Sequence, residues 1–323
     1  MAVPPGTTQT FAMVGIREDL SDVISNISPT ETPFYSMCRK ERTGSRMPEW
    51  QTDTLADADP DNAAIEGDDV VGDAFDPTVR LRNYVQLMDK TVIVSTTGQA
   101  VNTAGRADEL RYQVAKRGQE LKRDIEARIT QNGASAPGDA GTAGTMAGAE
   151  SWITTNADHG AGGSTPGYQS GTGIVPPPVD GTPRPAAEDD LKNVIRLAWE
   201  AGGDPSVIMT GGFNKQAFSA FAGIATQYKD NTARSLSRAV ILGAADYYVS
   251  DFGEHRIIAN RFQRDEAALV LDPSLWSLAF LQPFKTDPLG KTGHSDKRLL
   301  SVELTLKSWN EAGNGKVADL TTA

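Results

Sequence analysis

One long stretch of the chain has apolar residues at the spacing of an α-helix. It runs over residues 105–131, and Asn132-Gly133 then supplies a stop signal. The residues of its apolar face are Leu110, Val114, Leu121 and Ile125. At a rise of 1.5 Å per residue, the pattern predicts a helix roughly 40 Å long, which can act as a spine for other elements.

Alternating apolar and polar residues predict strands on both sides of this helix. Before it, Val79, Leu81, Val85 and Leu87 alternate with polar neighbours, and a strand-prone run follows over 91–96. Together with a limb that begins at Met47, these residues predict an extended hairpin. Near the C-terminus, further strands are predicted over 247–251, 256–260, 267–271, 275–282 and 300–306.

Helix and strand patterns alternate in the middle of the chain. They predict a helix over 187–201, a short buried strand over 207–209 and a second helix over 214–221. The aromatic and small residues expected to point inward at the second helix are Phe213, Ala217, Phe218 and Phe221. This alternation is typical of a compact α/β domain.

Two segments lack a core of their own. The N-terminal arm holds a helix candidate over 18–26 and a second one at Thr32-Pro33, where Phe34 and Met37 form a small apolar face. Residues 132–188 are dominated by Gly, Ala, Ser, Thr and Pro, which predicts a long and loosely ordered excursion. The apolar residues that could attach it to the body are Trp152, Ile153, Tyr168, Ile174 and Val175. We expect neighbouring copies to hold both segments.

These patterns together predict an α+β protein of six consecutive parts. The parts are an N-terminal arm (1–46), an extended hairpin loop (47–97), a spine helix (98–131), a Gly/Pro-rich insertion (132–188), an α/β domain (189–266) and closing strands with a tail (267–323). The alternation of helix and strand sets the fifth part apart from the others.

Charge separates an acidic loop from a basic helix. The net charge is -11, and residues 51–79 contain no Lys or Arg, so we expect this loop to project into solvent or onto a basic surface. Its candidates for inter-subunit contact are Asp53, Asp57, Asp59, Asp61, Glu66, Asp68 and Asp69. The other candidates are the basic residues Arg111, Lys116, Arg117, Lys122 and Arg123 and the apolar residues Phe34 and Trp50. A solvated helix face with local ion pairs is the alternative for the basic residues.

Composition argues against several kinds of chemistry. Cys38 has no partner for an intramolecular disulfide, and the three histidines lie far apart in the sequence. No apolar run is long enough to cross a membrane, and the acidic balance disfavours a broad nucleic-acid grip. Asp57, Asp59 and Asp61 have the spacing of calcium ligands, but Asn62 stands where a calcium loop needs Gly. We predict no catalytic residue, cofactor or metal; an enzyme without a recognisable motif is the alternative.

Two parts of the sequence resemble a known family. Residues 17–34 (REDLSDVISNISPTETPF) and 49–55 (EWQTDTL) resemble the opening of a family of tailed-phage major capsid proteins. Residues 202–209 (GGDPSVIM) with 213–221 resemble its central domain. The likeness covers most of the chain, and residues 132–188 depart from it.

The resemblance implies the Hong Kong 97-type fold, with an N-terminal arm, an extended β-hairpin loop, a peripheral domain with a spine helix, and an axial domain. It implies self-assembly through pentamers and hexamers into the icosahedral head of a tailed phage, which encloses double-stranded DNA without sequence-specific binding. Scaffold, portal and decoration proteins are the further partners expected. The chain would be made in the host bacterial cytoplasm and reside in the virion capsid. Another phage structural protein, such as a decoration or tail component, is the alternative.

Two expectations concern covalent processing. The family-like residues begin by Arg17, so we expect no removable scaffolding domain ahead of them. Some relatives of this fold join a hairpin lysine to a neighbour, but residues 51–79 contain no lysine. We therefore expect no covalent cross-link through this loop.

Overall fold

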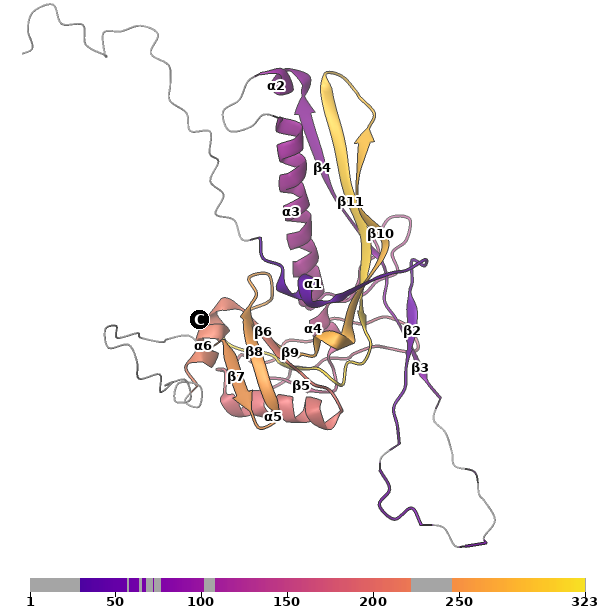
Figure 1. Cartoon of the computed structure of the whole chain (residues 1–323), viewed down its shortest axis with the longest axis vertical. Helices are drawn as coiled ribbons and strands as arrows, with labels where there is room; N and C mark the ends of the chain where they lie inside the picture. The colour runs from indigo at the N-terminus through magenta and orange to yellow at the C-terminus, as the bar shows by residue number, and fades with distance from the viewer. Residues whose placement is uncertain are drawn as a thin grey trace, which may run out of the picture.

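The computed structural model describes residues 30–56, 58–63, 66–67, 72, 77–101, 108–221 and 246–322. The molecule is elongated, with a long helix and a four-stranded sheet at one end and a six-stranded sheet at the other (Figure 1). A separate two-stranded stem, β2 (Glu49–Thr52) with β3 (Val79–Arg82), leads away from the long helix. The expected helix over 18–26 lies outside the described residues.

The four-stranded sheet has the order β1-β10-β11-β4. Its strands are β1 (Arg39–Arg42), β4 (Gln86–Ser95), β10 (Trp276–Leu289) and β11 (Ser295–Ser308). β1 pairs with β10 in parallel, whereas β10 with β11 and β11 with β4 are antiparallel. The early part of the chain is thus bound to its late part along one edge of this sheet.

The long helix α3 (Glu109–Thr130) follows the short helix α2 (Thr96–Ala100) and packs along β4 and β11. The Asp108 side chain accepts a hydrogen bond from the backbone N of Arg111 at 3.0 Å and so caps the helix start. Leu121 and Ile125 are buried, with Ile129 one turn further on. The predicted long helix is confirmed, although it begins at Glu109 and not at residue 105.

The faces of the strands before this helix differ from the prediction. Val79 and Leu87 were expected on one apolar face, yet they are 53% and 61% exposed, while Met88 is 8% exposed. Between β3 and β4, the amide of Asn83 donates to the backbone O of Leu306 at 2.8 Å and accepts from the backbone N of Ala147 at 3.0 Å. Because strand side chains alternate with a period of two, this interruption changes which residues face inward.

The six-stranded sheet has the order β5-β12-β9-β6-β8-β7. Its strands are β5 (Ala157–Asp158), β6 (Val207–Thr210), β7 (Tyr247–Ser250), β8 (Gly253–Ala259), β9 (Ala268–Leu271) and β12 (Gly315–Val317). From the sequence, β9 was grouped with the strands that close the chain, and the residues of β12 were placed in the tail, where no strand was predicted. Residues 267–323 are instead divided between the two large sheets, with the 3₁₀ helix η2 (Pro273–Leu275) between β9 and β10.

Two helices, α5 (Glu188–Glu200) and α6 (Gly212–Ser219), pack against the six-stranded sheet. Their positions confirm the predicted order of helix, strand and helix in this region. Phe218 is buried, but Phe213 is 42% exposed and does not point inward as expected. Five positions along a helix turn the side chain by about 140°, so these two residues cannot share one face.

Residues 132–188 belong to the core, and the expectation of a loosely ordered excursion was wrong. In and around the short helix α4 (Ala149–Trp152), Met146, Trp152 and Ile153 are fully or almost fully buried. The Trp152 ring stacks on Tyr168 at 6.0 Å between centroids and meets Trp50 at 5.6 Å. The few large apolar residues of this Gly-rich stretch therefore enter the main hydrophobic cluster instead of standing in solvent.

Candidate inter-subunit contact surfaces

Trp50 anchors the base of the acidic loop to the body of the chain. Its ring is 5% exposed, and Nε1 donates to the backbone O of Ser308 at 2.7 Å. Beside it, Glu49 lies 3.6 Å from Arg80 and 3.9 Å from Arg82 across the β2–β3 stem. The cations of this hairpin thus lie at its stem, and the loop beyond the stem contains none.

Beyond the stem, the loop presents carboxylates to solvent. Asp53, Asp59, Asp61 and Glu66 are exposed, and no ion pair within the described part of the chain involves them. The other candidates of this loop, Asp57, Asp68 and Asp69, lie outside the described residues. Leu55 projects among these carboxylates with 97% of its surface exposed. The described residues of the loop thus combine carboxylates that form no ion pair with the exposed apolar side chain of Leu55.

The five basic candidates on α3 differ in their availability. Arg111, Lys116 and Lys122 are exposed. Arg117 instead forms an ion pair with Glu120, three residues further along the helix. The guanidinium of Arg123 lies over the ring of Phe262 at 5.3 Å. Three of the five cations thus face solvent, and two have partners in their own chain.

Phe34 and Trp50 pack inside their own chain and do not offer an apolar surface to a neighbour. Phe34 is 1% exposed and meets Trp276 edge to face at 5.7 Å. Its helix, α1 (Pro33–Met37), is bound to α3 through Glu126, whose carboxylate accepts from the backbone N atoms of Phe34 at 2.8 Å and Tyr35 at 2.7 Å. Apolar residues next to a predicted helix start were an ambiguous signal, because a core and an interface select the same residue types.

Glu126 is a residue that the sequence did not single out. It also accepts a hydrogen bond from the amide of Asn260 at 2.6 Å, which joins the arm, the spine helix and the loop after β8. Burial raises the pKa of Glu126, while the hydrogen bonds that it accepts act in the opposite direction. From the sequence, this charged residue was expected on a solvated face of the helix. Its role becomes clear only from its hydrogen-bond partners, which lie far along the chain.

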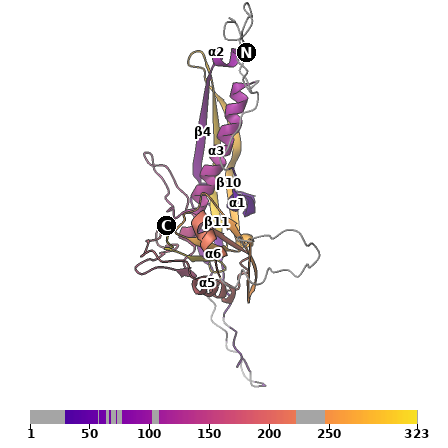
Figure 2. The ribbon, with the colours of Figure 1, turned by 90° about the vertical axis from the view of Figure 1, so that its left-hand side faces the viewer.

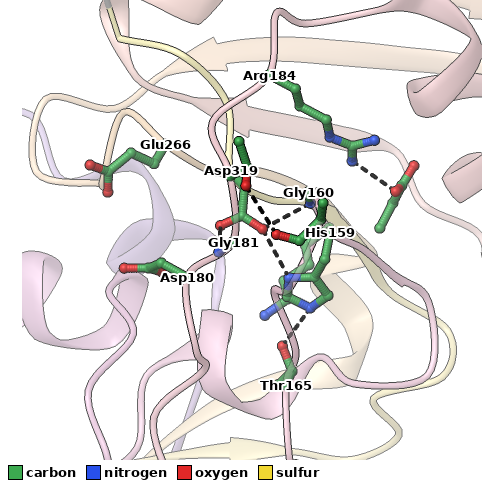
Figure 3. Close-up of polar contacts among 12 residues, drawn as sticks. His159, Gly160, Thr165, Asp180, Gly181, Arg184, Glu266 and Asp319 are labelled. Carbon is green, nitrogen blue, oxygen red and sulfur yellow. Dashed lines mark hydrogen bonds and ion pairs between the residues drawn. The ribbon is translucent and has the colours of Figure 1, made fainter.

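A second polar cluster ties residues 132–188 to the C-terminal tail (Figure 3). Asp319, at a left-handed φ of 59°, accepts hydrogen bonds from the backbone N atoms of Gly160 at 2.9 Å and Gly181 at 2.7 Å. His159 Nδ1 lies 3.4 Å from the same carboxylate, and burial lowers the pKa of this histidine. The cluster is an internal clasp, since its groups bind one another.

Next to this clasp, two opposite charges are buried. Lys316 is fully buried and donates from Nζ to the backbone O of Glu150 at 2.7 Å, and Glu150 lies 3.0 Å from Arg264. Burial raises the pKa of Glu150 to about 7 and lowers the pKa of Lys316 to about 8. Their linkage holds α4 and β12 together in the interior.

Neither a metal centre nor a membrane span is found among the residues that the structure describes. No group of three or more His, Cys, Asp or Glu in these ranges could hold a metal ion. In the same ranges, no helix is long and apolar enough to cross a bilayer.

Comparison with known proteins gives a consistent result. A family profile described as SU10 major capsid protein matches residues 5–321. The major capsid protein of Escherichia phage Phieco32 is 28% identical over 338 aligned residues, with 93% of each chain covered. Among solved structures, the capsid asymmetric unit of cyanophage A-1(L) has a TM-score of 0.67 at 13% identity and covers 97% of this chain and 99% of its own. A structure described as Mycobacterium phage Che8 has a TM-score of 0.57 at 14% identity and covers 94% of this chain and 97% of its own.

Proposed function

Because the chain belongs to the SU10 major capsid protein family, we propose that it closes the DNA-filled icosahedral head of a tailed phage by laying its acidic loop on the spine helix of a neighbouring copy. The role of a shell-forming major capsid protein comes with the family, and no enzyme activity belongs to it. The observation that carries the loop contact is the separation of charge. Exposed carboxylates lie on a loop without cations, and exposed cations lie on α3, on the other side of the body.

The parts of the chain are assigned to the Hong Kong 97-type layout as follows. The arm to residue 46, the hairpin loop around β2 and β3, and α3 with the four-stranded sheet correspond to the N-terminal arm, the extended loop and the peripheral domain. The six-stranded sheet with α5 and α6 corresponds to the axial domain at the centre of pentamers and hexamers. The mixed α+β fold shared with phage capsid structures supports this layout.

The proposed contact between the acidic loop and α3 draws its free energy from many weak ion pairs. A single exposed ion pair contributes only about 0 to 1 kcal/mol, so the loop needs several pairs on each copy and many copies in the shell. A loop that binds a different surface of the next copy makes a head-to-tail interface, which closes into rings when the rotation permits. Such contacts are screened by salt over a Debye length of about 8 Å at physiological ionic strength.

Further partners follow from the same proposal. The copies would enclose double-stranded DNA without reading its sequence, in a virion assembled from chains made in the host cytoplasm. Scaffold, portal and decoration proteins are the other partners proposed; one similar solved structure is described as containing major capsid and decoration proteins of phage G. No membrane takes part.

Replacing Asp57, Asp59 and Asp61 together with Asn tests the loop contact. Electron microscopy of the purified protein should show shells for the parent and a loss of shells for the triple variant. Added salt should weaken assembly of the parent, because it screens the ion pairs. A control with Asp189→Asn, Asp251→Asn and Glu254→Gln removes the same charge from exposed positions elsewhere and should still assemble. Equal loss in both variants would contradict the proposal, and calcium-dependent assembly of the parent would indicate a metal at the loop instead.

A further inference from the structure

A hollow opens between α3 and β10 on the spine side of the four-stranded sheet. Its volume is about 360 Å³. Its floor and walls include Ala115 and Gly118 of α3, Phe284 of β10 and Leu300 of β11. Phe284 is 38% exposed there, although it is a large apolar residue. The chain thus leaves an apolar depression uncovered on its own surface.

Gly118 keeps this hollow open. Glycine is unfavourable in the interior of a helix, and α3 has 22 residues around this position. A Cβ at Gly118 would meet only Leu300 Cδ2, at 3.9 Å, so the packing of this chain does not require a glycine there. Apolar cavities of about 150 Å³ already accept a benzene molecule, so the larger hollow has room for an apolar side chain from outside.

The described chain also contains an apolar side chain without a place to pack. Leu55 is 97% exposed, on the loop that leaves the body through β2 and β3. The β2–β3 stem leads away from α3 (Figure 1), and the turned view shows α3 rising from the body at the end away from α5 (Figure 2). The described loop residues beyond the stem and the hollow, which is lined by α3, therefore lie apart in one molecule. The hollow that receives Leu55 must therefore belong to a second copy.

Charge selects the same pairing. Lys122 of α3 and Lys285 of β10 line the hollow, and Lys285 lies 3.3 Å from the carboxylate of Asp287. Leu55 stands between Asp53 and Asp57 in the sequence, on a loop without cations. The apolar side chain of Leu55 is thus flanked by carboxylates, and the apolar hollow is flanked by ammonium groups, so the two surfaces are complementary in charge.

We propose that Leu55 of one copy inserts into the α3–β10 hollow of the next copy, with the neighbouring carboxylates meeting Lys122 and Lys285. The inference rests on the loop contact proposed above and adds its receptor site. Leu55 supplies apolar burial at the centre of the contact, and the surrounding charges set direction and register. Gly118 is the residue that makes the receptor deep enough.

Disulfide trapping in assembled particles tests this pairing. The full chain carries Leu55→Cys with Gly118→Cys, and the native Cys38 is 2% exposed, so the introduced thiols are the reactive ones. Oxidation should convert the monomer band into a ladder of linked chains, because a disulfide needs Cα atoms within about 7 Å. The matched control carries Leu55→Cys with Asp124→Cys, at an exposed position on the same helix but outside the hollow, and should stay monomeric.

Each other outcome is decisive. Intact shells without a ladder from positions 55 and 118, or an equal ladder from the control, would overturn the hollow as receptor. A disulfide within one chain between Val14→Cys and Gly118→Cys would assign the hollow to the N-terminal arm instead. If the unaltered chain forms no shells at all, it is the proposed function that fails.

A filling variant gives a second, independent readout. Gly118→Leu places a side chain in the hollow of every copy and should reduce shell formation while the unassembled subunit keeps its unfolding midpoint. Asp124→Leu adds the same side chain at an exposed position of α3 outside the hollow and should assemble as the parent does. Full assembly of Gly118→Leu would overturn the inference.

Discussion

Among single residues, Gly118 and Gly148 show how differently two glycines can act. A Cβ at Gly118 would make only an ordinary contact with Leu300 Cδ2 at 3.9 Å, whereas a Cβ at Gly148 would lie 2.0 Å from the backbone O of Gln131. We expect Gly118→Ala to raise the free energy of unfolding of the unassembled subunit by about 0.5–1 kcal/mol, because alanine favours a helix. Gly148→Ala should lower it. Urea denaturation measures both, and a loss of stability in Gly118→Ala would mean that position 118 is packed.

Glu150 gives the stability of the subunit a defined pH dependence. Its pKa rises from 4.5 to about 7 because of burial, so the folded chain holds this proton more tightly than the unfolded chain does. The stability from this group is complete below pH 4.5 and is lost as the pH rises through about 7. Glu150→Gln should therefore flatten the fall in unfolding free energy over this range, as measured by urea denaturation at a series of pH values.

Lys316 acts in a separate range. Burial lowers its pKa from 10.5 to about 8, so its contribution is complete above pH 10.5 and is lost as the pH falls through about 8. This range lies above that of Glu150, and the two effects can be separated in one titration. An unchanged pH profile in Glu150→Gln would contradict the assignment of the slope to this carboxyl.

The sequence reveals some of these residues and hides others. The exposed carboxylates of the loop follow from charge alone, because a segment without cations has nothing in itself to pair with. Glu126 and Asp319 could not be recognised, since their partners, such as Asn260 and Gly160, lie far along the chain. Phe34 and Trp50 were misplaced because apolar character does not distinguish a core from an interface.

At the scale of elements, Trp152 measures how firmly residues 132–188 belong to the core. We expect Trp152→Ala to lower the free energy of unfolding by about 3–5 kcal/mol, because it removes a buried ring that packs against Trp50 and Tyr168. Trp199→Ala is the matched control, since that ring is 53% exposed and contacts Phe252 at the surface. Chemical denaturation of the unassembled subunit should show a clearly smaller loss for the control.

The long helix and the Gly-rich stretch mark the two ends of what sequence patterns can predict. α3 carries its apolar residues at helical spacing over many turns, so local periodicity was sufficient. Residues 132–188 have no such period, and their order comes from side chains such as Trp152 and Val175 that enter a core built by other elements. The inward face of β4 was predicted wrongly for a similar reason. Asn83 separates β3 from β4, and its hydrogen bonds go to Leu306 and Ala147, which lie far along the chain.

At the scale of the whole molecule, the composition of the loop predicts the chemistry of the particle. Residues 51–79 contain no lysine, so no amide bond can form between a loop lysine and a neighbouring chain. Particles boiled in detergent should therefore release single, unlinked chains. Denaturing electrophoresis measures this, and a ladder of covalent oligomers would contradict it.

The strand order has a consequence for synthesis. β11 lies inside the four-stranded sheet and β12 inside the six-stranded one, yet both come from residues 295–317. Domains that emerge from the ribosome fold as units when their strands are available, but here neither sheet can be completed before these late residues leave the exit tunnel. A nascent chain therefore lacks the finished surface of α3 and the four-stranded sheet, and we expect shells to grow from released chains and not from chains still on the ribosome.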